Sequence, residues 1–435
     1  MKLSWFSIFR LGLVQMALGA IVVLTTSTLN RLLVVEMALP AILPGFLVAL
    51  HYGIQITRPN WGFLSDMGGN RTKWIIGGMA ALALGGLAAT VGTILFETQF
   101  ALGLAVSIIA YALIGLGVGA SGTSLLALLA TATEPRRRAA AATITWLMMI
   151  FGLALTGTLV GKMLDPYSPA LLLKIVAIVV SVAFLITCLA IWGIERRVIA
   201  EPRDEAAVPF MVGLREIWSE REARHFTIFV FLSMVAYFMQ ELILEPYAGL
   251  VFAFTPGEST SLSGAQNGGV FMGMLTVGIA VTGLKIGSLR FWVTFGCLSS
   301  AIALVIIAVL GQTGTGAPLS AAVIFLGFSN GIFAVAAIGS MMQLAGQGRT
   351  GREGIRMGLW GAAQAIAAGF GGLFGAGAVD AARLFTVSDG TAYGIVFLFE
   401  AVLFLIAAAV ALRVIAGHSK VERPLTQGEF SCATM

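Results

Sequence analysis

Two segments of this chain place ionisable and amide side chains inside otherwise apolar stretches. In the second, QELILEP, two carboxylates stand four residues apart, so they share one face if the segment is a helix. Polar groups in such surroundings must pair with one another, carry protons or bind polar parts of a ligand, because leaving them unpaired in an apolar medium costs several kcal/mol. TLNRLLVVE supplies Asn30, Arg31 and Glu36, and QELILEP supplies Gln240, Glu241 and Glu245 before Pro246, where we expect the helix to end.

A third segment, ALHYGIQITRPNWG, places His51 and Gln55 one helical turn apart. A single His in an apolar helix is most often a hydrogen-bonded packing residue. Its imidazole can also carry a proton or serve as an axial ligand to the metal of a macrocycle. Both interpretations stay open from the sequence. No group of His and Cys residues has zinc-ligand spacing, so we expect no intrinsic metal site.

Composition identifies the class of protein that must hold these residues. Of its 435 residues 58% are hydrophobic and 11% are charged, and the mean hydropathy is +0.95. Soluble domains average about 25% charged residues, so this is an all-α integral membrane protein. We predict twelve transmembrane helices, each long enough to cross roughly 30 Å of hydrocarbon. Their centres are expected near Val23, Val48, Leu84, Ile114, Phe151, Val182, Met234, Thr276, Leu304, Ser329, Ala367 and Leu403.

The longest polar stretch divides the predicted spans six and six. We therefore predict an amino-terminal half over residues 1–195 and a cytoplasmic linker over 196–224 that contains an amphipathic segment. A carboxy-terminal half over 225–417 and a tail over 418–435 follow. The halves resemble each other weakly: a shift of 214 positions aligns Arg138 with Arg352, Trp146 with Trp360, Gly157 with Gly371 and Gly161 with Gly375. We expect two pseudo-symmetric halves whose fifth and eleventh helices approach their neighbours closely at these glycines.

The 26 Lys and Arg residues orient the bundle. Most of them fall on one side of the predicted membrane, and the positive-inside rule assigns that side to the cytoplasm. Both termini are then expected in the cytoplasm. The net charge of +5 is explained by this topology, so we expect no nucleic-acid partner.

One loop, GFLSDMGGNRTK, resembles the loop between helices two and three of major facilitator superfamily transporters. The resemblance implies the major facilitator fold and a role for the acid in locking the cytoplasmic ends of the two halves. Met67 and Asn70 stand where basic residues are common, and the equivalent loop KIGSLR has no acid. The loop and its flanks define a predicted cytoplasmic gate of Arg58, Gly62, Asp66, Gly69, Arg71, Lys73, Arg138 and Arg352.

In that fold helices one and seven both line the central cavity. Arg31 is therefore expected to pair with Glu241 or Glu245 across the interface of the halves. The alternative is that Arg31 reaches toward the outer membrane surface beside Glu36.

Four longer phrases are similar to the PucC/LhaA family of photosynthetic assembly proteins, a branch of the same superfamily: TLNRLLVVEMALPA, LHYGIQITRPNWGFLSDMGGNRTKWIIGG, EPRRRAAAATITWLMMIFG and FMQELILEPYAGLVF. The resemblance implies delivery of bacteriochlorophyll to light-harvesting antenna α and β polypeptides, in the bacterial inner or intracytoplasmic photosynthetic membrane. It also suggests contact with bacteriochlorophyll-synthesising enzymes and membrane lipids. His51 then becomes a candidate axial ligand to the pigment Mg.

Two other functions stay open. One is a proton-coupled transporter of a small organic solute, with Glu241, Glu245 or His51 as proton carriers. The other is a pigment-free scaffold for antenna peptides. We expect no enzyme, because the sequence has neither a phosphate-binding GxxxxGK[ST] motif nor paired Asp-rich motifs for a magnesium diphosphate.

Overall fold

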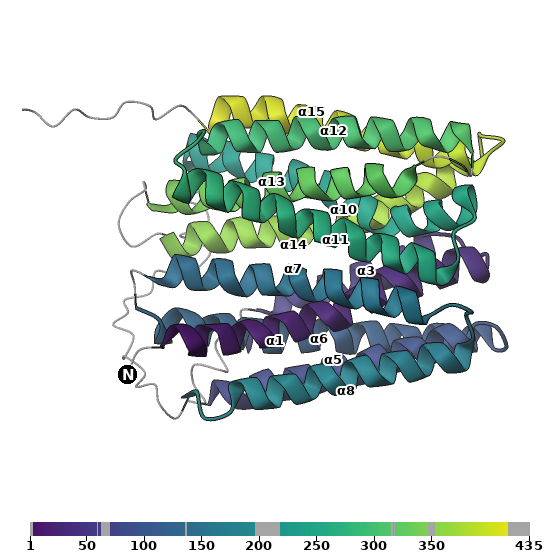
Figure 1. The fold of residues 1–435 in the computed structure, drawn as a ribbon, viewed down its shortest axis with the longest axis horizontal. Coiled ribbons are helices and arrows are strands. Elements are labelled where there is room, and N and C mark those ends of the chain that lie inside the picture. Colours follow the sequence, from purple (N-terminus) through teal and green to yellow (C-terminus); the bar gives the residue numbers. More distant parts are fainter. Residues whose placement is uncertain are drawn as a thin grey trace, which may run out of the picture.

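A computed structural model describes residues 3–58, 60–61, 70–134, 137–195, 218–314, 316, 318–346 and 353–415. The described chain is a bundle of long helices that run nearly parallel to one another (Figure 1). The helices of the amino-terminal half lie on one side of the bundle and those of the carboxy-terminal half on the other.

The amino-terminal half contains six helical rods. The first rod is continuous from Trp5 to Glu36, but two of its turns are widened to π-helix. Its parts are α1 (Trp5–Val23), η1 (Leu24–Thr28), α2 (Leu29–Arg31) and η2 (Leu32–Glu36). The others are α3 (Ile42–Ile54) with η3 (Gln55–Thr57), α5 (Arg71–Leu95), α6 (Phe100–Ala132), α7 (Arg138–Met163) and α8 (Pro169–Ile191).

Six further rods form the carboxy-terminal half. They are α10 (Arg221–Phe252), α11 (Pro256–Gly278) with η6 (Ile279–Gly283), α12 (Leu289–Thr313), α13 (Leu319–Gly346), α14 (Glu353–Arg383) and α15 (Asp389–Val414). Because α10 begins at Arg221, it takes up the last residues of the predicted linker, while residues 196–217 lie outside the described part.

The prediction of an all-helical membrane protein is confirmed. Ten of the described helices are long and apolar enough to cross a membrane, and each predicted centre falls inside a separate rod. The remaining two rods are α3, which is shorter, and α11, which begins with the polar run GESTS. These two occupy the second and eighth places, so they are counterparts in the two halves.

Side chains at the helix starts explain several boundaries. Ser4, Ser168, Ser288 and Ser388 each accept a hydrogen bond from a backbone N–H of the following first turn. Thr255 and Glu258 cap α11 reciprocally as a capping box. These contacts satisfy N–H groups that have no partner within the helix.

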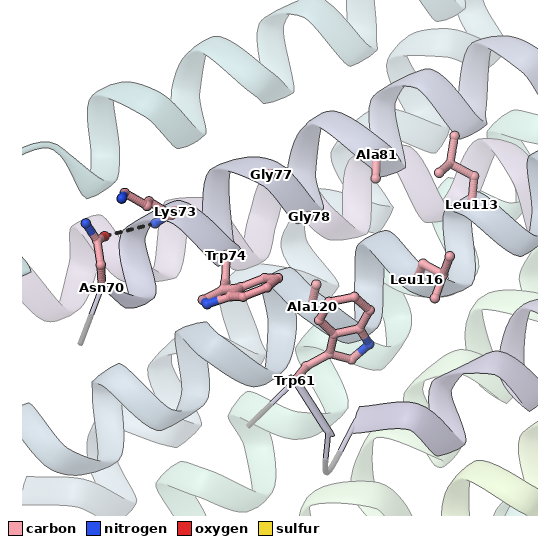
Figure 2. Close-up of a pocket in the computed structure, with 10 residues that line it drawn as sticks. All are labelled: Trp61, Asn70, Lys73, Trp74, Gly77, Gly78, Ala81, Leu113, Leu116 and Ala120. Atoms are coloured by element: carbon pink, nitrogen blue, oxygen red, sulfur yellow. Dashed lines mark hydrogen bonds between the residues drawn. The ribbon is translucent and has the colours of Figure 1, made fainter. Parts of the chain in front are cut away.

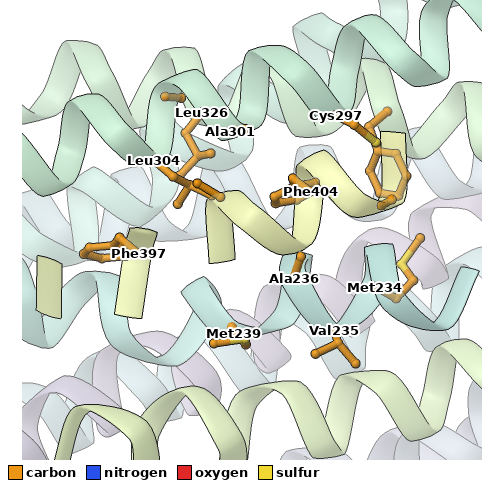
Figure 3. Packing of buried hydrophobic residues seen from close by; sticks show 14 of the residues in the cluster. Met234, Val235, Ala236, Met239, Cys297, Ala301, Leu304, Leu326, Phe397 and Phe404 are labelled. Carbon is orange, nitrogen blue, oxygen red and sulfur yellow. The ribbon is translucent and has the colours of Figure 1, made fainter. Parts of the chain in front are cut away.

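Each half has its own apolar core. One cluster of buried side chains lies entirely within residues 226–415, and another lies within 3–194 apart from Leu242. Figure 3 shows the first cluster, in which Phe397 and Phe404 of α15 face Leu304 and Ala301 of α12 across the core. Each half therefore packs around an apolar interior of its own. Polar side chains that could bind a ligand are to be sought at the interface between the halves.

Close helix contacts join the halves at one end of the bundle, which we call the outer end. It lies opposite the amino terminus, on the right in Figure 1, where α7 joins α8 and α10 joins α11. There a Cβ on Gly161 of α7 would stand 2.4 Å from the Ser261 backbone nitrogen of α11, and one on Gly157 would stand 2.9 Å from Gly264. The predicted close approach at these glycines is confirmed.

Pro246 does not end α10, contrary to the expectation. The helix continues to Phe252 with Pro246 inside it. A proline in a helix interior lacks an N–H and leaves the carbonyl four residues earlier without its partner, which here is the carbonyl of Leu242.

Candidate functional site

The strongest candidate site is a polar seam between the first rod and helices α10 and α11. The first rod contributes short side chains from the widened turn η1, and Asn30 and Arg31 from α2 directly after it. Such a widened turn is a departure from regular helix that is frequent at functional sites. Almost all the members are buried, although they come from opposite halves. We define the seam as Thr26, Ser27, Thr28, Asn30, Arg31, Gln240, Glu241, Glu245, Thr260 and Ser263.

Asn30 explains how the proline in α10 is tolerated. The Asn30 side-chain amide donates to the Leu242 carbonyl at 2.7 Å, in a fully buried position. This is the carbonyl that Pro246 leaves without an intrahelical partner. Asn30 therefore replaces a missing backbone hydrogen bond of the other half, which ties the first rod to α10 at a fixed height.

Arg31 is 2% exposed and makes its ion pair with Glu36, with 2.5 Å between Nη1 and the carboxylate oxygen. Its Nη2 donates to the Phe254 carbonyl at 2.7 Å, just beyond the end of α10. A cation at that position also interacts favourably with the helix dipole. The predicted ion pair with Glu241 or Glu245 is not formed among the described residues. Arg31 acts on Glu245 only through longer-range electrostatics.

The two carboxyl groups of α10 have different surroundings. Glu245 is buried, and one of its oxygens accepts a hydrogen bond from the Ser27 hydroxyl of the opposite half. Its other oxygen makes no hydrogen bond of normal geometry in the described structure, although the Ser263 side chain of α11 lies close to the carboxyl group. The Gln240 side-chain oxygen also has no partner there. Glu241 is half-buried, with the Thr26 hydroxyl within hydrogen-bonding reach. The seam thus holds acceptors that a donor from a ligand could still satisfy.

An aromatic group adjoins Glu241. The Tyr52 ring of α3 meets the Phe238 ring of α10 edge-on at 5.7 Å between centroids, and Phe238 meets Tyr237 at 5.1 Å. Glu241 and Arg58 lie close enough to the Tyr52 phenol to interact with it electrostatically. These aromatic residues were absent from the sequence-based site. The segment AYFMQELILEP, which carries Tyr237 and Phe238 beside the acids, was the available signal for these two, and Tyr52 next to His51 was the signal for the third.

His51 lies next to Tyr52 in a short chain of polar side chains that runs from α3 through η3 to Arg58. Its Nε2 is 3.0 Å from the Gln55 side-chain nitrogen, and the Gln55 oxygen accepts from Arg58. Because Gln55 donates to Nε2, the imidazole proton belongs on Nδ1, which is buried and has no partner among the described atoms. His51 and Gln55 are thus brought together as expected, and they extend toward Arg58.

The structure describes only part of the predicted cytoplasmic gate. Gly62, Asp66, Gly69 and Arg352 lie outside the described residues. Arg138 donates to the Thr133 carbonyl at 3.3 Å, and Arg71 donates to the Thr131 hydroxyl at 2.6 Å. Both contacts stay within the amino-terminal half.

Lys73 lines a hollow of about 610 Å³ on the same half. Figure 2 shows the Trp61 and Trp74 rings next to each other in its lining, and their centroids are 5.5 Å apart. The lining is mostly apolar, and Gly77 and Leu116 are exposed on it. The full set is Trp61, Asn70, Lys73, Trp74, Gly77, Gly78, Ala81, Leu113, Leu116 and Ala120.

One further acid lies apart from these groups. Glu400 of α15 is completely buried, and neither of its carboxyl oxygens has a partner in the described structure. Glu400 is not among the site residues predicted from the sequence, although a single acid within an apolar run was a signal for it. In the part of the chain described here, no group of three or more His, Cys, Asp or Glu side chains is placed to hold a metal ion.

Comparisons with known proteins agree with this architecture. Residues 28–419 match the model of a family described as PUCC protein. The chain is 65% identical over 424 residues to the bacteriochlorophyll synthase 44.5 kDa chain of Rhodobacter capsulatus, covering 98% of this chain and 99% of the relative. It is 30% identical to the protein PucC of Cereibacter sphaeroides, covering 83% and 81%.

Solved structures of transporters share the fold. The chain is similar to a peptide transporter POT with a TM-score of 0.70 and 14% identity, over 95% of this chain and 96% of that one. It is also similar to a bacterial homologue of the lysosomal transporter Spinster in an inward-facing conformation, with a TM-score of 0.68, 13% identity and coverage of 94% and 96%. These likenesses show the major facilitator fold.

Proposed function

Because this chain belongs to the PUCC protein family, we propose that it is an assembly factor that binds bacteriochlorophyll and delivers it to light-harvesting antenna polypeptides. A relative that matches it over nearly its whole length carries bacteriochlorophyll in its name. The proposed place of action is the photosynthetic membrane, with the antenna α and β polypeptides and pigment-synthesising enzymes as partners.

The observation that carries this proposal is the aromatic group beside Glu241. Tyr52, Tyr237 and Phe238 are half-buried where α3 and α10 meet, so each ring packs against a core on one side and keeps part of its surface accessible. A bacteriochlorophyll is a large apolar ring with keto and ester carbonyls on its rim. Ring faces with a few polar groups beside them suit such a ligand, since binding sites combine apolar walls with sparse oriented donors.

The pigment Mg takes an axial nitrogen or oxygen ligand, and His51 remains our candidate for it. Its Nε2 is occupied by Gln55, whereas its Nδ1 is unpartnered among the described atoms. Axial binding by Nε2 would require Gln55 to turn away toward Arg58, to which it is already bonded. The proton then stays on Nδ1, and the Nε2 lone pair that Gln55 now occupies becomes free, so axial binding would replace the Gln55 contact.

The direct test is the absorption spectrum of the protein purified from photosynthetic membranes. We expect bound bacteriochlorophyll in the wild type and a loss of about tenfold or more in pigment per protein for Tyr52→Ala with Phe238→Ala. The matched control is Phe291→Ala, because Phe291 is an exposed aromatic residue of α12 away from this group. Equal pigment in the double variant and the control would overturn the proposed position.

A second candidate function is a proton-coupled transporter, and the unpaired oxygen of Glu245 is the observation that favours it. A buried carboxyl group with a spare oxygen can accept and release a proton. Proton uptake with solute by the purified protein in vesicles, abolished by Glu245→Gln, would support this function. Normal antenna assembly by a protein that carries neither pigment nor protons would instead indicate a scaffold.

We also propose that the chain is not itself a catalyst, although a relative is named as a synthase chain. The absence of paired Asp-rich motifs in the sequence supports this. Turnover of pigment precursors by the purified protein alone would contradict it.

A further inference from the structure

Two carboxylates at the outer end bind helix amino termini that belong to the opposite half. Asp165, just after α7, accepts from the Thr255 hydroxyl at 2.6 Å and from the Gly257 N–H at 3.1 Å, both at the start of α11. Asp380, in the last turn of α14, accepts from the Ala41 N–H at 3.1 Å and from the Ile42 N–H at 2.8 Å, at the start of α3.

The two contacts are related by the pseudo-symmetry of the halves. Helices α7 and α14 occupy the fifth and eleventh places, and α11 and α3 occupy the eighth and second. One contact joins the end of the fifth rod to the start of the eighth, and the other joins the end of the eleventh rod to the start of the second. Exchanging the two halves therefore turns one contact into the other. The two positions therefore have the same chemistry, a carboxylate of one half bound to a helix amino terminus of the other.

Local packing is shaped to admit the Asp165 carboxylate. A Cβ on Gly257 would stand 2.3 Å from an Asp165 oxygen, so only glycine lets the carboxylate approach this N–H. The Thr255 hydroxyl accepts from the Glu258 N–H while it donates to Asp165, so it joins the capping box of α11 to the other half. The free N–H groups and the dipole of a helix amino terminus favour a negative charge at this position.

We infer that Asp165 and Asp380 form a two-point latch, the outer latch, that keeps the outer end of the half interface closed. On the inner side of the outer latch lie Arg31, which donates to the Phe254 carbonyl, and the buried Ser263 beside Glu245. With the outer latch closed, a ligand reaches the seam from the inner end or from the membrane. Opening toward the outer side requires both carboxylates to leave their helix termini.

The test is the access of a membrane-impermeant maleimide, applied from the outer side, to a cysteine placed beneath the outer latch. Ser263→Cys is nearly isosteric and is made in a background in which Cys188, Cys297 and Cys432 are replaced. We expect slow labelling with the outer latch intact and at least roughly tenfold faster labelling in Asp165→Ala with Asp380→Ala, with each single variant between them.

Two controls isolate the effect. Val387→Cys, on an exposed loop at the same end, should be labelled equally in every background. Glu97→Ala removes an exposed acid of the turn between α5 and α6, at the same end but within the amino-terminal half, and should leave Ser263→Cys slow. Asp389 is not suitable for this purpose, because its partner Arg383 also pairs with Asp380, at 3.6 Å. If the alanine pair does not accumulate, Asp165→Asn with Asp380→Asn keeps the side-chain volume and should still speed labelling.

Unchanged labelling of Ser263→Cys in either double variant would overturn the inference. It would mean that the close helix contacts at glycines keep the outer end closed without the two carboxylates. The readout needs no pigment and no antenna, so it is independent of the proposed function.

Discussion

The outer and inner ends of this bundle use the same chemistry with opposite consequences. At the outer end, Asp165 and Asp380 each bind a helix amino terminus of the other half. At the inner end, Glu195 binds the Arg71 and Thr72 N–H groups at 2.7 and 2.8 Å, and these begin α5 of its own half. The carboxylate makes the same kind of contact with a helix start in both places. It joins the halves when the helix belongs to the other half, and it stabilises a single half when the helix belongs to its own.

Other contacts follow the same division. Arg10 donates to the Trp192 carbonyl at 2.6 Å, which joins the first rod to the end of α8 within the amino-terminal half. The seam contacts of Ser27, Asn30 and Arg31 cross between the halves in the middle and toward the outer end. The polar contacts between the halves thus lie at the seam and the outer end, whereas farther inward α7 and α11 meet through apolar side chains such as Phe151 and Phe271.

The largest expected effect comes from adding one methyl group to the outer half interface. In Gly161→Ala the new Cβ would meet the Ser261 nitrogen and, at 2.6 Å, the Gly257 carbonyl oxygen. These are backbone atoms, so α7 and α11 must separate, at a cost of about 3 kcal/mol. The measurement is the thermal unfolding midpoint in detergent, together with outer labelling of Ser263→Cys.

Gly122→Ala is the matched control, because Gly122 is a helical glycine with no atom within 4 Å of its added Cβ. We expect no loss of stability there, since alanine is the better helix former by about 1 kcal/mol. Equal losses in the two variants would mean that the outer interface is not tightly packed.

A smaller effect is expected at Asn30. Asn30→Ala leaves the buried Leu242 carbonyl without a donor, which costs about 2 kcal/mol. In a Pro246→Ala background the restored N–H of residue 246 can serve that carbonyl, so Asn30→Ala should then cost less. A double-mutant cycle on unfolding free energies measures this coupling, which we expect to be about 1 kcal/mol. Strict additivity would show that Asn30 does not replace the bond lost at the proline.

At the inner end, Glu195→Ala should cost about 1–2 kcal/mol, because it removes the partner of two N–H groups and the Thr72 hydroxyl. Glu195→Gln keeps one accepting oxygen and should recover part of this. Since the contact lies within one half, outer labelling of Ser263→Cys should not change. Faster labelling in Glu195→Ala would break the contrast between the two ends.

The smallest effect is expected at Asn70. Its side chain accepts from the Lys73 N–H at 3.2 Å in an exposed position at the start of α5. Asn70→Ala should cost no more than about 1 kcal/mol. Asn70→Asp, which keeps the accepting oxygen, should match the wild type in the same unfolding measurement, and a loss as large as that of Glu195→Ala would contradict this ranking.

The sequence by itself determined the class, the rods and the inventory of buried polar residues. Whether a segment crosses the membrane depends on the summed transfer free energies of about twenty consecutive residues. The centre of each rod can therefore be predicted without knowing which other rods pack against it. The acids of QELILEP and the polar run around Arg31 were visible for the same reason, as local exceptions in apolar stretches.

Tertiary structure alone decided the partners. Whether Arg31 meets Glu36 or Glu245, whether Asn30 reaches the Leu242 carbonyl, and whether Asp380 caps α3 depend on the rotation and height of rods far apart in the chain. Pro246 was expected to end a helix because local propensity disfavours it there, yet a side chain from the other half supplies the missing donor. Asp165 and Glu195 carried no signal beyond being acids near helix ends, because a helix terminus becomes a binding partner only once another rod lies beside it.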